Sequence, residues 1–198
     1  MPAGKLVTMN LQLSDEEQVF VGEIRSFLAA HWVSVSASIA LMPGPRLSRA
    51  TKRFMAALGA RGWLAGQWPV AAGGADWSDR ERLLWEQEAA VACAPQTPYQ
   101  GVDVLGPLLF RAGSAAQQKK HLPGIASGQV SWCQAFAEDS GALDLACIET
   151  RAVPFESTSG WRLTGSKPWV LDIPQGYEER DCWFYLLALT KGTAGADD

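Results

Sequence analysis

The spacing of apolar residues changes near residue 130 of the chain. Before that point apolar side chains recur every three or four positions, as on one face of an α-helix. Capping residues and helix breakers mark the ends of the expected helices. They predict a helix opened by a Ser14/Glu17 capping box, one from about Ser48 to Gly62, one from Ser78 with Glu81 through Val91, one over Val104–Phe110, and one opened by Ser114 with Gln117 and closed at Pro123 and Gly124.

After Gly128 the pattern is typical of β-strands. The expected strands cover residues 129–138, 146–156, 161–171 and 181–190, with a turn at 157–160. We therefore predict an α+β fold with an all-helical domain over residues 1–129 and an incomplete, antiparallel, barrel-like β domain over residues 130–198. So small a sheet needs a partner for its apolar face, and either the helical domain or another chain can supply it.

Composition and charge disfavour several classes of function. The net charge is −4, so nucleic acid is not expected as a partner. No apolar run approaches the roughly 20 residues of a membrane span. The N-terminus has no apolar signal-peptide core. We therefore expect no membrane partner and a cytoplasmic location.

The cysteines and histidines do not have the spacing of a metal site, and no metal is expected. The cysteines include no C-x-x-C pair and are Cys93, Cys133, Cys147 and Cys182. His31 and His121 have no ligand-spaced neighbour. Buried, reduced thiols are the expected state. Spacing alone leaves a Ser-His-Asp or Cys-His site open, although no G-x-S-x-G elbow supports one.

Nine tryptophans are a large number for 198 residues. Their large apolar area predicts packing in a core or an interface. The alternative is that one of them lies against a flat cofactor.

Five segments in order carry the pattern of a known family. The first helix reads LSDEEQVFVGEIRSFLAAHW, and a later stretch reads LGARGWLAGQWPVAAGGADW. The run FRAGSAAQQKKHLPGIASGQVSWCQAFAE leads into the β region, where DLACIETRAV and WRLTGSKPWV follow. In order, spacing and the switch from helix to strand, these segments resemble the acyl-CoA dehydrogenases, flavoenzymes that desaturate acyl-CoA thioesters.

The resemblance implies a three-domain fold, a cofactor and a reaction. The domains are an N-terminal helical domain, a central β-barrel-like domain and a C-terminal four-helix bundle, and the bundle is absent from this sequence. The implied cofactor is FAD, whose ring lies between the β domain and the bundle. The family's catalytic glutamate lies in the bundle, so no catalytic residue is expected in this chain.

The resemblance also locates the flavin site. The matching positions are Gln134, Phe136, Ala137, Ala142, Leu143, Trp169 and Leu171. Ala137 and Leu171 stand where the family has hydroxyls that bond the flavin, and Ala142–Leu143 replaces a Gly-Ser pair. At about 0.5–1.5 kcal/mol for each hydrogen bond, three missing hydroxyls weaken flavin binding by roughly 1.5–4.5 kcal/mol. We therefore expect poor flavin binding by the chain alone, and expect Trp169 to pack rather than to stack on a flavin.

Two acids, Glu138 and Asp144, flank the small-residue loop in this region. Acids in such places usually hold the loop by accepting backbone N–H bonds. A role in proton transfer would need a raised pKa and a substrate within reach. We predict a structural role for both.

The sequence supports three hypotheses for function. The first is a non-catalytic, supporting subunit of a heteromeric, FAD-dependent acyl-CoA dehydrogenase, with a homologous chain as partner and an acyl-CoA as substrate of the assembly. The second is a fragment of a full-length active enzyme of that family. The third is an acyl-thioester or carrier-binding module without catalysis.

Overall fold

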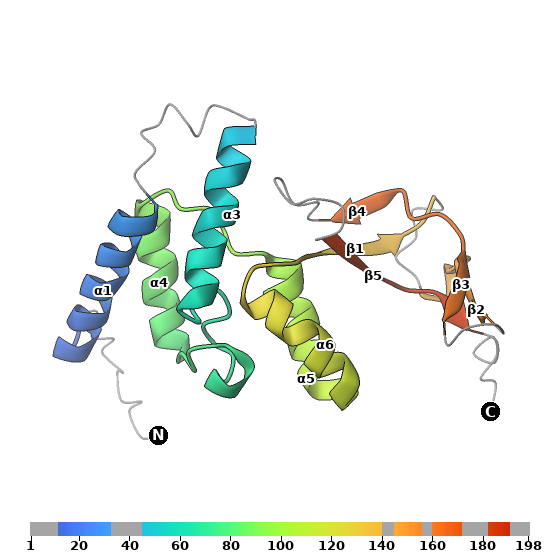
Figure 1. Cartoon of the computed structure of the whole chain (residues 1–198), viewed down its shortest axis with the longest axis horizontal. Helices are drawn as coiled ribbons and strands as arrows, with labels where there is room; N and C mark the ends of the chain where they lie inside the picture. The colour runs from blue at the N-terminus through green and yellow to red at the C-terminus, as the bar shows by residue number, and fades with distance from the viewer. Residues whose placement is uncertain (1–11, 33–44, 140–144, 156–159, 172–181, 191–198) are drawn as a thin grey trace, which may run out of the picture.

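Helices and strands lie at opposite ends of the molecule (Figure 1). The computed structural model describes residues 12–32, 45–139, 145–155, 160–171 and 182–190. The helices are α1 (Asp15–His31), α3 (Pro45–Ala60), α4 (Asp79–Val91), α5 (Gly106–Ala112) and α6 (Ala115–Ala126), with the short turns η1 (Val70–Ala72) and η2 (Gln100–Leu105). The strands are β1 (Ser131–Ala137), β2 (Arg151–Pro154), β3 (Trp161–Thr164), β4 (Trp169–Leu171), β5 (Cys182–Leu186) and β6 (Leu189–Thr190), with the turn η3 (Leu145–Cys147) between β1 and β2. The predicted α+β class is confirmed.

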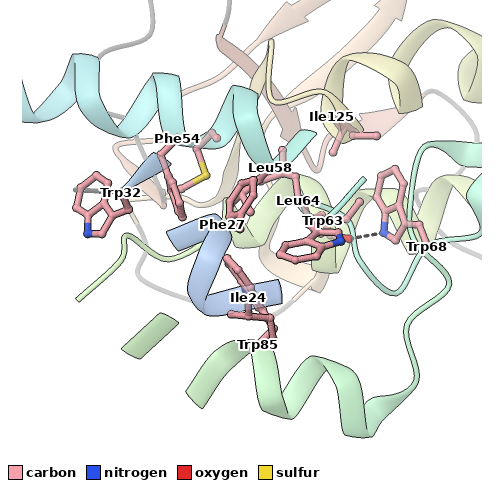
Figure 2. Packing of buried hydrophobic residues seen from close by; sticks show 14 of the residues in the cluster. Ile24, Phe27, Trp32, Phe54, Leu58, Trp63, Leu64, Trp68, Trp85 and Ile125 are labelled. Carbon is pink, nitrogen blue, oxygen red and sulfur yellow. Dashed lines mark hydrogen bonds between the residues drawn. The ribbon is translucent and has the colours of Figure 1, made fainter. Parts of the chain in front are cut away.

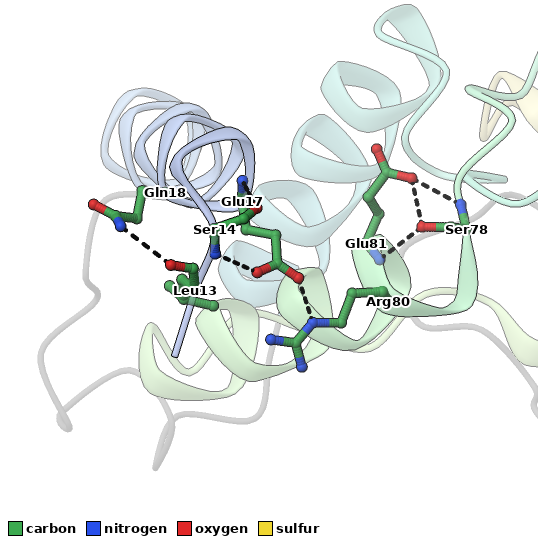
Figure 3. A network of polar contacts seen from close by, with 7 residues as sticks. All are labelled: Leu13, Ser14, Glu17, Gln18, Ser78, Arg80 and Glu81. Carbon is green, nitrogen blue, oxygen red and sulfur yellow. Dashed lines mark hydrogen bonds and ion pairs between the residues drawn. The ribbon is translucent and has the colours of Figure 1, made fainter. Parts of the chain in front are cut away.

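Capping boxes open three of the helices, as the sequence predicts. In each box a serine hydroxyl accepts a backbone N–H, and the side chain three residues on accepts the N–H of that serine; the pairs are Ser14 with Glu17, Ser78 with Glu81, and Ser114 with Gln117. Figure 3 shows the first two boxes side by side. Arg80 connects them, because its Nε lies 2.6 Å from Oε1 of Glu17. The start of α1 is therefore tied to the start of α4.

One hydrophobic core joins α1, α3 and α4 with the loop that follows α3 (Figure 2). Ile24, Phe54 and Leu58 are completely buried in it. Tryptophans supply much of its volume, and those that are buried are Trp32, Trp63, Trp68, Trp85 and Trp132. The predicted packing role of the tryptophans is confirmed for these five.

The helix predicted over residues 104–110 is built differently. A π-helical turn, η2, runs from Gln100 to Leu105, and α5 begins at Gly106. Gly106 is needed there because a Cβ would lie 1.9 Å from Cζ2 of the buried Trp68. Pro107 follows in the first turn of α5, where a missing N–H costs nothing.

The strands form two three-stranded sheets rather than one antiparallel barrel. The first has the order β4-β1-β5, and the second has the order β3-β2-β6. The pairs β1–β4 and β2–β3 are antiparallel, whereas β1–β5 and β2–β6 are parallel. The predicted antiparallel pairing is found in β1–β4 and β2–β3, and the two parallel pairs are the correction to it. Among the described residues the strands close no barrel.

Two predicted strands each divide between the two sheets. Residues 161–171 give β3 in one sheet and β4 in the other, and residues 182–190 divide in the same way into β5 and β6. In the first case Gly165, at a φ of 155°, and Pro168 interrupt the run. The predicted strand 146–156 is reduced to β2, because η3 occupies its first residues. The predicted turn at 157–160 lies largely outside the described residues.

The first sheet is anchored to the helical part at one end. Trp132 of β1 belongs to the same core as the helices, and the next residue, Cys133, is fully buried. The hydroxyl of Tyr185 on β5 donates to Oε1 of Gln100 on η2. Away from this junction the strands carry large exposed side chains, among them Trp161, Leu163, Trp169, Leu171 and Phe184. No helix among the described residues is long and apolar enough to cross a membrane.

Candidate functional site

The end of β1 and the neighbouring strand β4 bring four of the predicted site residues together. Gln134 pairs with Leu171, and Ala137 pairs with Trp169, with a bulge in β1 between the two pairs. Phe136 lies on β1 between them and meets the ring of Tyr185 edge-to-face at 5.4 Å. Ala142 and Leu143 lie outside the described residues, as does Asp144.

Glu138, the residue after β1, is the centre of a buried polar cluster. Its Oε1 accepts from Oγ1 of Thr150 at 2.6 Å and from N of Thr150 at 3.0 Å. Its Oε2 accepts from N of Glu149 at 2.7 Å. Nζ of Lys167 lies 2.7 Å from Oε1 and also donates to the carbonyl of Phe136 at 2.9 Å. The carboxylate therefore ties the end of β1 to the start of β2 and to the β3–β4 connection.

The electrostatics of this cluster favour a structural role for Glu138. The ammonium of Lys167, followed by Thr150 and two backbone N–H groups, lowers the pKa of Glu138 to about 2. Side chains of both ion-pair partners are less than a tenth exposed. A carboxylate this acidic and this fully hydrogen-bonded is a poor proton acceptor near neutral pH. The predicted structural role is confirmed for Glu138.

Trp169 and Leu171 present their side chains to solvent at the edge of the first sheet. Trp169 is 68% exposed and Leu171 is 56% exposed. Among the residues that the structure describes, no other side chain covers Trp169, and its packing rather than stacking on a flavin stays a prediction. The physical reason for the exposure is that β4 is a three-residue edge strand, and its side chains gain no cover from β1, which pairs with it edge to edge.

The residues of this edge do not fit the polar rim of a flavin ring. Ala137 and Leu171 carry only apolar atoms, at the positions where the resemblance places hydroxyl groups. Of the four paired residues Gln134, Ala137, Trp169 and Leu171, Gln134 has a polar amide side chain, which is half-buried. The exposed indole of Trp169 supplies a flat apolar surface but little hydrogen bonding.

Sequence reasoning missed the partners of Glu138. Lys167 lies in the segment WRLTGSKPWV, two residues before Trp169. Its place in a segment that carries the family resemblance could have indicated a role near β1. Its contact with Glu138 joins residues 29 apart in sequence. Thr150 had no comparable signal, because a lone threonine in a strand is common.

The cysteines and histidines supply no second site. Cys133 is buried as predicted, but Cys93 and Cys147 are exposed, so the prediction of buried thiols is wrong for these two. His31 packs on Phe27 at 4.5 Å, and His121 lies edge-on to Trp132 at 5.1 Å. Burial lowers the pKa of His121, and the charge of Lys120 adds to this. Within the part of the chain that the structure describes, no cluster of three His, Cys, Asp or Glu residues could hold a metal.

The sequence matches a family and several curated proteins. Residues 14–129 match the family described as acyl-CoA dehydrogenase, N-terminal domain. Acyl-CoA dehydrogenase IpdE1 of Mycolicibacterium smegmatis is 32% identical over 162 residues, which are 79% of this chain and 41% of that protein. Acyl-CoA dehydrogenase FadE26 of Mycobacterium tuberculosis is 32% identical over 118 residues, 60% of this chain and 29% of that protein. The chain thus spans less than half the length of these relatives.

Solved structures show the same fold. The ChsE4-ChsE5 complex from Mycobacterium tuberculosis contains a chain that matches with a TM-score of 0.68 and 26% identity, over 93% of this chain and 44% of that one. The Tcur3481-Tcur3483 steroid ACAD matches with a TM-score of 0.66 and 26% identity, over 94% of this chain and 46% of that one. Both matches run through the helical part and the strands.

Proposed function

The chain belongs to the acyl-CoA dehydrogenase family, and we propose that it is a supporting, non-catalytic subunit of a heteromeric member of that family. The assembly would carry out FAD-dependent α,β-desaturation of an acyl-CoA thioester. A homologous partner chain would hold the flavin and supply the catalytic base. This chain would supply the helical part and the two sheets that complete the fold around the partner's site.

The observation that carries this proposal is the apolar pair at the end of β1 and in β4. Ala137 and Leu171 leave the flavin-facing edge without hydroxyl groups, while the frame around it is kept. The frame is the cluster of Glu138, Thr150 and Lys167, whose bonds are all 3.0 Å or shorter. A chain that preserves the scaffold and loses the polar contacts is suited to support a site rather than to bind the cofactor itself.

Two further observations support a partner chain. The strands expose large apolar side chains that water solvates poorly, and exposed apolar patches of this kind mark interaction surfaces. The structural relatives include a complex of two differently named chains, ChsE4 and ChsE5, and an enzyme named by two chains, Tcur3481 and Tcur3483. We propose the same kind of pairing for this protein.

The test is the flavin content of the purified chain. The chain is expressed alone and together with a homologue from a neighbouring gene, and the visible flavin absorption of each preparation is measured against protein concentration. We expect a colourless chain alone and a yellow complex. A yellow chain with one flavin per protein, purified alone, would overturn the proposal.

A substitution sharpens this test. Leu171→Thr adds one hydroxyl to the exposed strand β4. One hydrogen bond from it to the flavin should raise the flavin affinity of the variant chain about 2- to 12-fold over that of the unsubstituted chain. Leu163→Thr is the matched control, because Leu163 is an equally exposed strand leucine in the other sheet. An equal response of the two variants would show that position 171 does not face the flavin.

A further inference from the structure

A cavity of about 510 Å³ lies in the helical part, away from the β1–β4 edge. It is lined by the loop between α3 and η1, by Trp77 in the segment between η1 and α4, by α4, and by the stretch from Thr97 through η2 into α5. Its volume is in the range of small-molecule sites, about 300–1,000 Å³. Its walls include four indole rings, those of Trp63, Trp68, Trp77 and Trp85. Figure 2 shows three of these, Trp63 and Trp68 from the loop and Trp85 from α4.

The aromatic walls are held rigidly in place. Nε1 of Trp68 donates to the carbonyl of Val102 at 3.0 Å. The ring of Trp77 lies so close to Gly66 that a Cβ there would be 2.0 Å from it. Trp63 meets the ring of Trp85 edge-on at 5.8 Å. Rings fixed in this way lose little conformational freedom when a flat molecule binds between them.

One acidic side chain, that of Asp103, lines this cavity and is paired only loosely with a cation. Asp103 lies within the π-helical turn η2, a type of turn that is frequent at functional sites, and its side chain is 23% exposed. Its nearest cation is Nη1 of Arg82 at 3.4 Å. Among the described residues no group donates a hydrogen bond to its carboxylate. Burial raises the pKa of Asp103, which is the sign of a carboxylate whose lost hydration is only partly replaced.

The charges around Asp103 limit what can bind there. Arg82 makes its shorter contacts elsewhere, with Oε1 of Gln67 at 2.6 Å and Oε1 of Glu86 at 2.7 Å. A cationic ligand at Asp103 would lie beside this guanidinium and be repelled by it. The guanidinium of Arg111 also lines the cavity, but an anionic ligand that reached Asp103 would meet its carboxylate and that of Glu86. A neutral hydrogen-bond donor satisfies Asp103 without either penalty.

We propose that this cavity binds a neutral ring-bearing alcohol or phenol, whose hydroxyl donates to Asp103 and whose apolar rings lie against the indoles. The proposal does not depend on the flavin or on a partner chain, because every residue of the site belongs to the helical part. It assigns the π-helical turn a role: the turn places Asp103 at the wall of an aromatic cavity.

The test compares two probes that differ in one hydrogen-bond donor. Binding of 2-naphthol and of 2-methoxynaphthalene to the purified full chain is measured by equilibrium dialysis. A hydrogen bond to a charged acceptor should make 2-naphthol bind about 10-fold tighter or more. Asp103→Ala should remove this preference. Asp79→Ala is the control, because Asp79 bonds to Gln67 at 2.8 Å in the same network but does not line the cavity.

Each outcome decides for or against the site. A preference for 2-naphthol that is lost in Asp103→Ala and kept in Asp79→Ala supports it. Equal binding of the two probes, no binding of either, tighter binding of 2-naphthoate than of 2-naphthol, or an unchanged preference in Asp103→Ala overturns it. If Asp103→Ala does not fold, Asp103→Asn takes its place, and the comparison of probes on the unsubstituted chain still decides. The flavin content of the preparation, which tests the proposed function, does not affect this result.

Discussion

At the scale of single residues, Glu138 shows how a buried charge can be tolerated. A carboxylate removed from water is costly unless donors replace its hydration. Here Lys167, Thr150 and two backbone N–H groups surround it. These contacts, all made by groups of the chain, hold the end of β1, the start of β2 and the β3–β4 connection together. The frame of this region is therefore a property of the chain itself.

The stabilisation from Glu138 should depend on pH in a defined direction. Its pKa is lowered from 4.5 to about 2 in the folded chain, so the folded state favours the ionised form. The stabilisation is fully present above pH 4.5 and is lost as the pH falls through that value toward 2. In urea unfolding, the advantage of the unsubstituted chain over Glu138→Gln should therefore be largest near neutral pH and shrink below pH 4.5.

A second variant identifies the cause of this dependence. Lys167→Met removes the largest contribution to the low pKa, so the loss of stability between pH 4.5 and 2 should become shallower. The same slope in Lys167→Met and in the unsubstituted chain would contradict the assignment of Lys167 as the main partner.

At the scale of elements, close backbone contacts decide which helices can pack. Gly106 opens α5 directly against the indole of Trp68, and that indole is fixed by its hydrogen bond to Val102. Gly22 is also helical, on α1, but an added Cβ there meets nothing within 4 Å. A side chain is therefore excluded at Gly106 of α5, whereas there is room for one at Gly22 of α1.

Alanine substitutions at these two glycines should change stability in opposite directions. Gly106→Ala forces a methyl group into the space of Trp68 and should lower the free energy of unfolding by about 1–3 kcal/mol. Gly22→Ala removes the helix penalty of glycine and should raise it by up to about 1 kcal/mol. Urea denaturation of both variants measures the difference. Destabilisation of Gly22→Ala, or tolerance of Gly106→Ala, would show that the packing around these residues is different.

At the scale of the whole molecule, burial is unevenly distributed. The helical part and the start of β1 share one core, whereas the far strands expose apolar side chains such as Trp161 and Trp169. Exposed tryptophans on a rigid sheet are typical of residues that contribute strongly to an interface. The apolar surface of the sheets is the place where we expect the partner chain.

A charged residue in this surface should weaken association without unfolding the chain. Trp161 is 56% exposed, so Trp161→Asp should leave the thermal midpoint of the chain nearly unchanged. If Trp161 is an anchor worth about 2 kcal/mol or more, affinity for the homologous partner should fall about 30-fold or more. Sedimentation velocity of mixtures measures the affinity. Val70→Asp, at an exposed position of η1 in the helical part, is the control and should not change it.

Features that depend on neighbours along the chain could be predicted from the sequence. The capping boxes at Ser14, Ser78 and Ser114 were predictable because each is made by residues three apart. The switch from helix to strand near residue 130 follows in the same way from the periodicity of apolar residues. The structural role of Glu138 was also predictable, because an acid beside a small-residue loop usually holds that loop.

Features made by residues far apart in sequence could not be predicted and are seen only in the folded chain. The parallel pairing of β1 with β5, the division of residues 161–171 between two sheets, and the ion pair of Glu138 with Lys167 all depend on how the chain returns to itself. So does the exposure of Trp169, because a tryptophan in a strand pattern looks the same whether or not another element covers it. The aromatic cavity beside Asp103 belongs here too, since four segments separated in the sequence form its walls. Local propensity does not report such contacts, because their free energy comes from surfaces that meet only after folding.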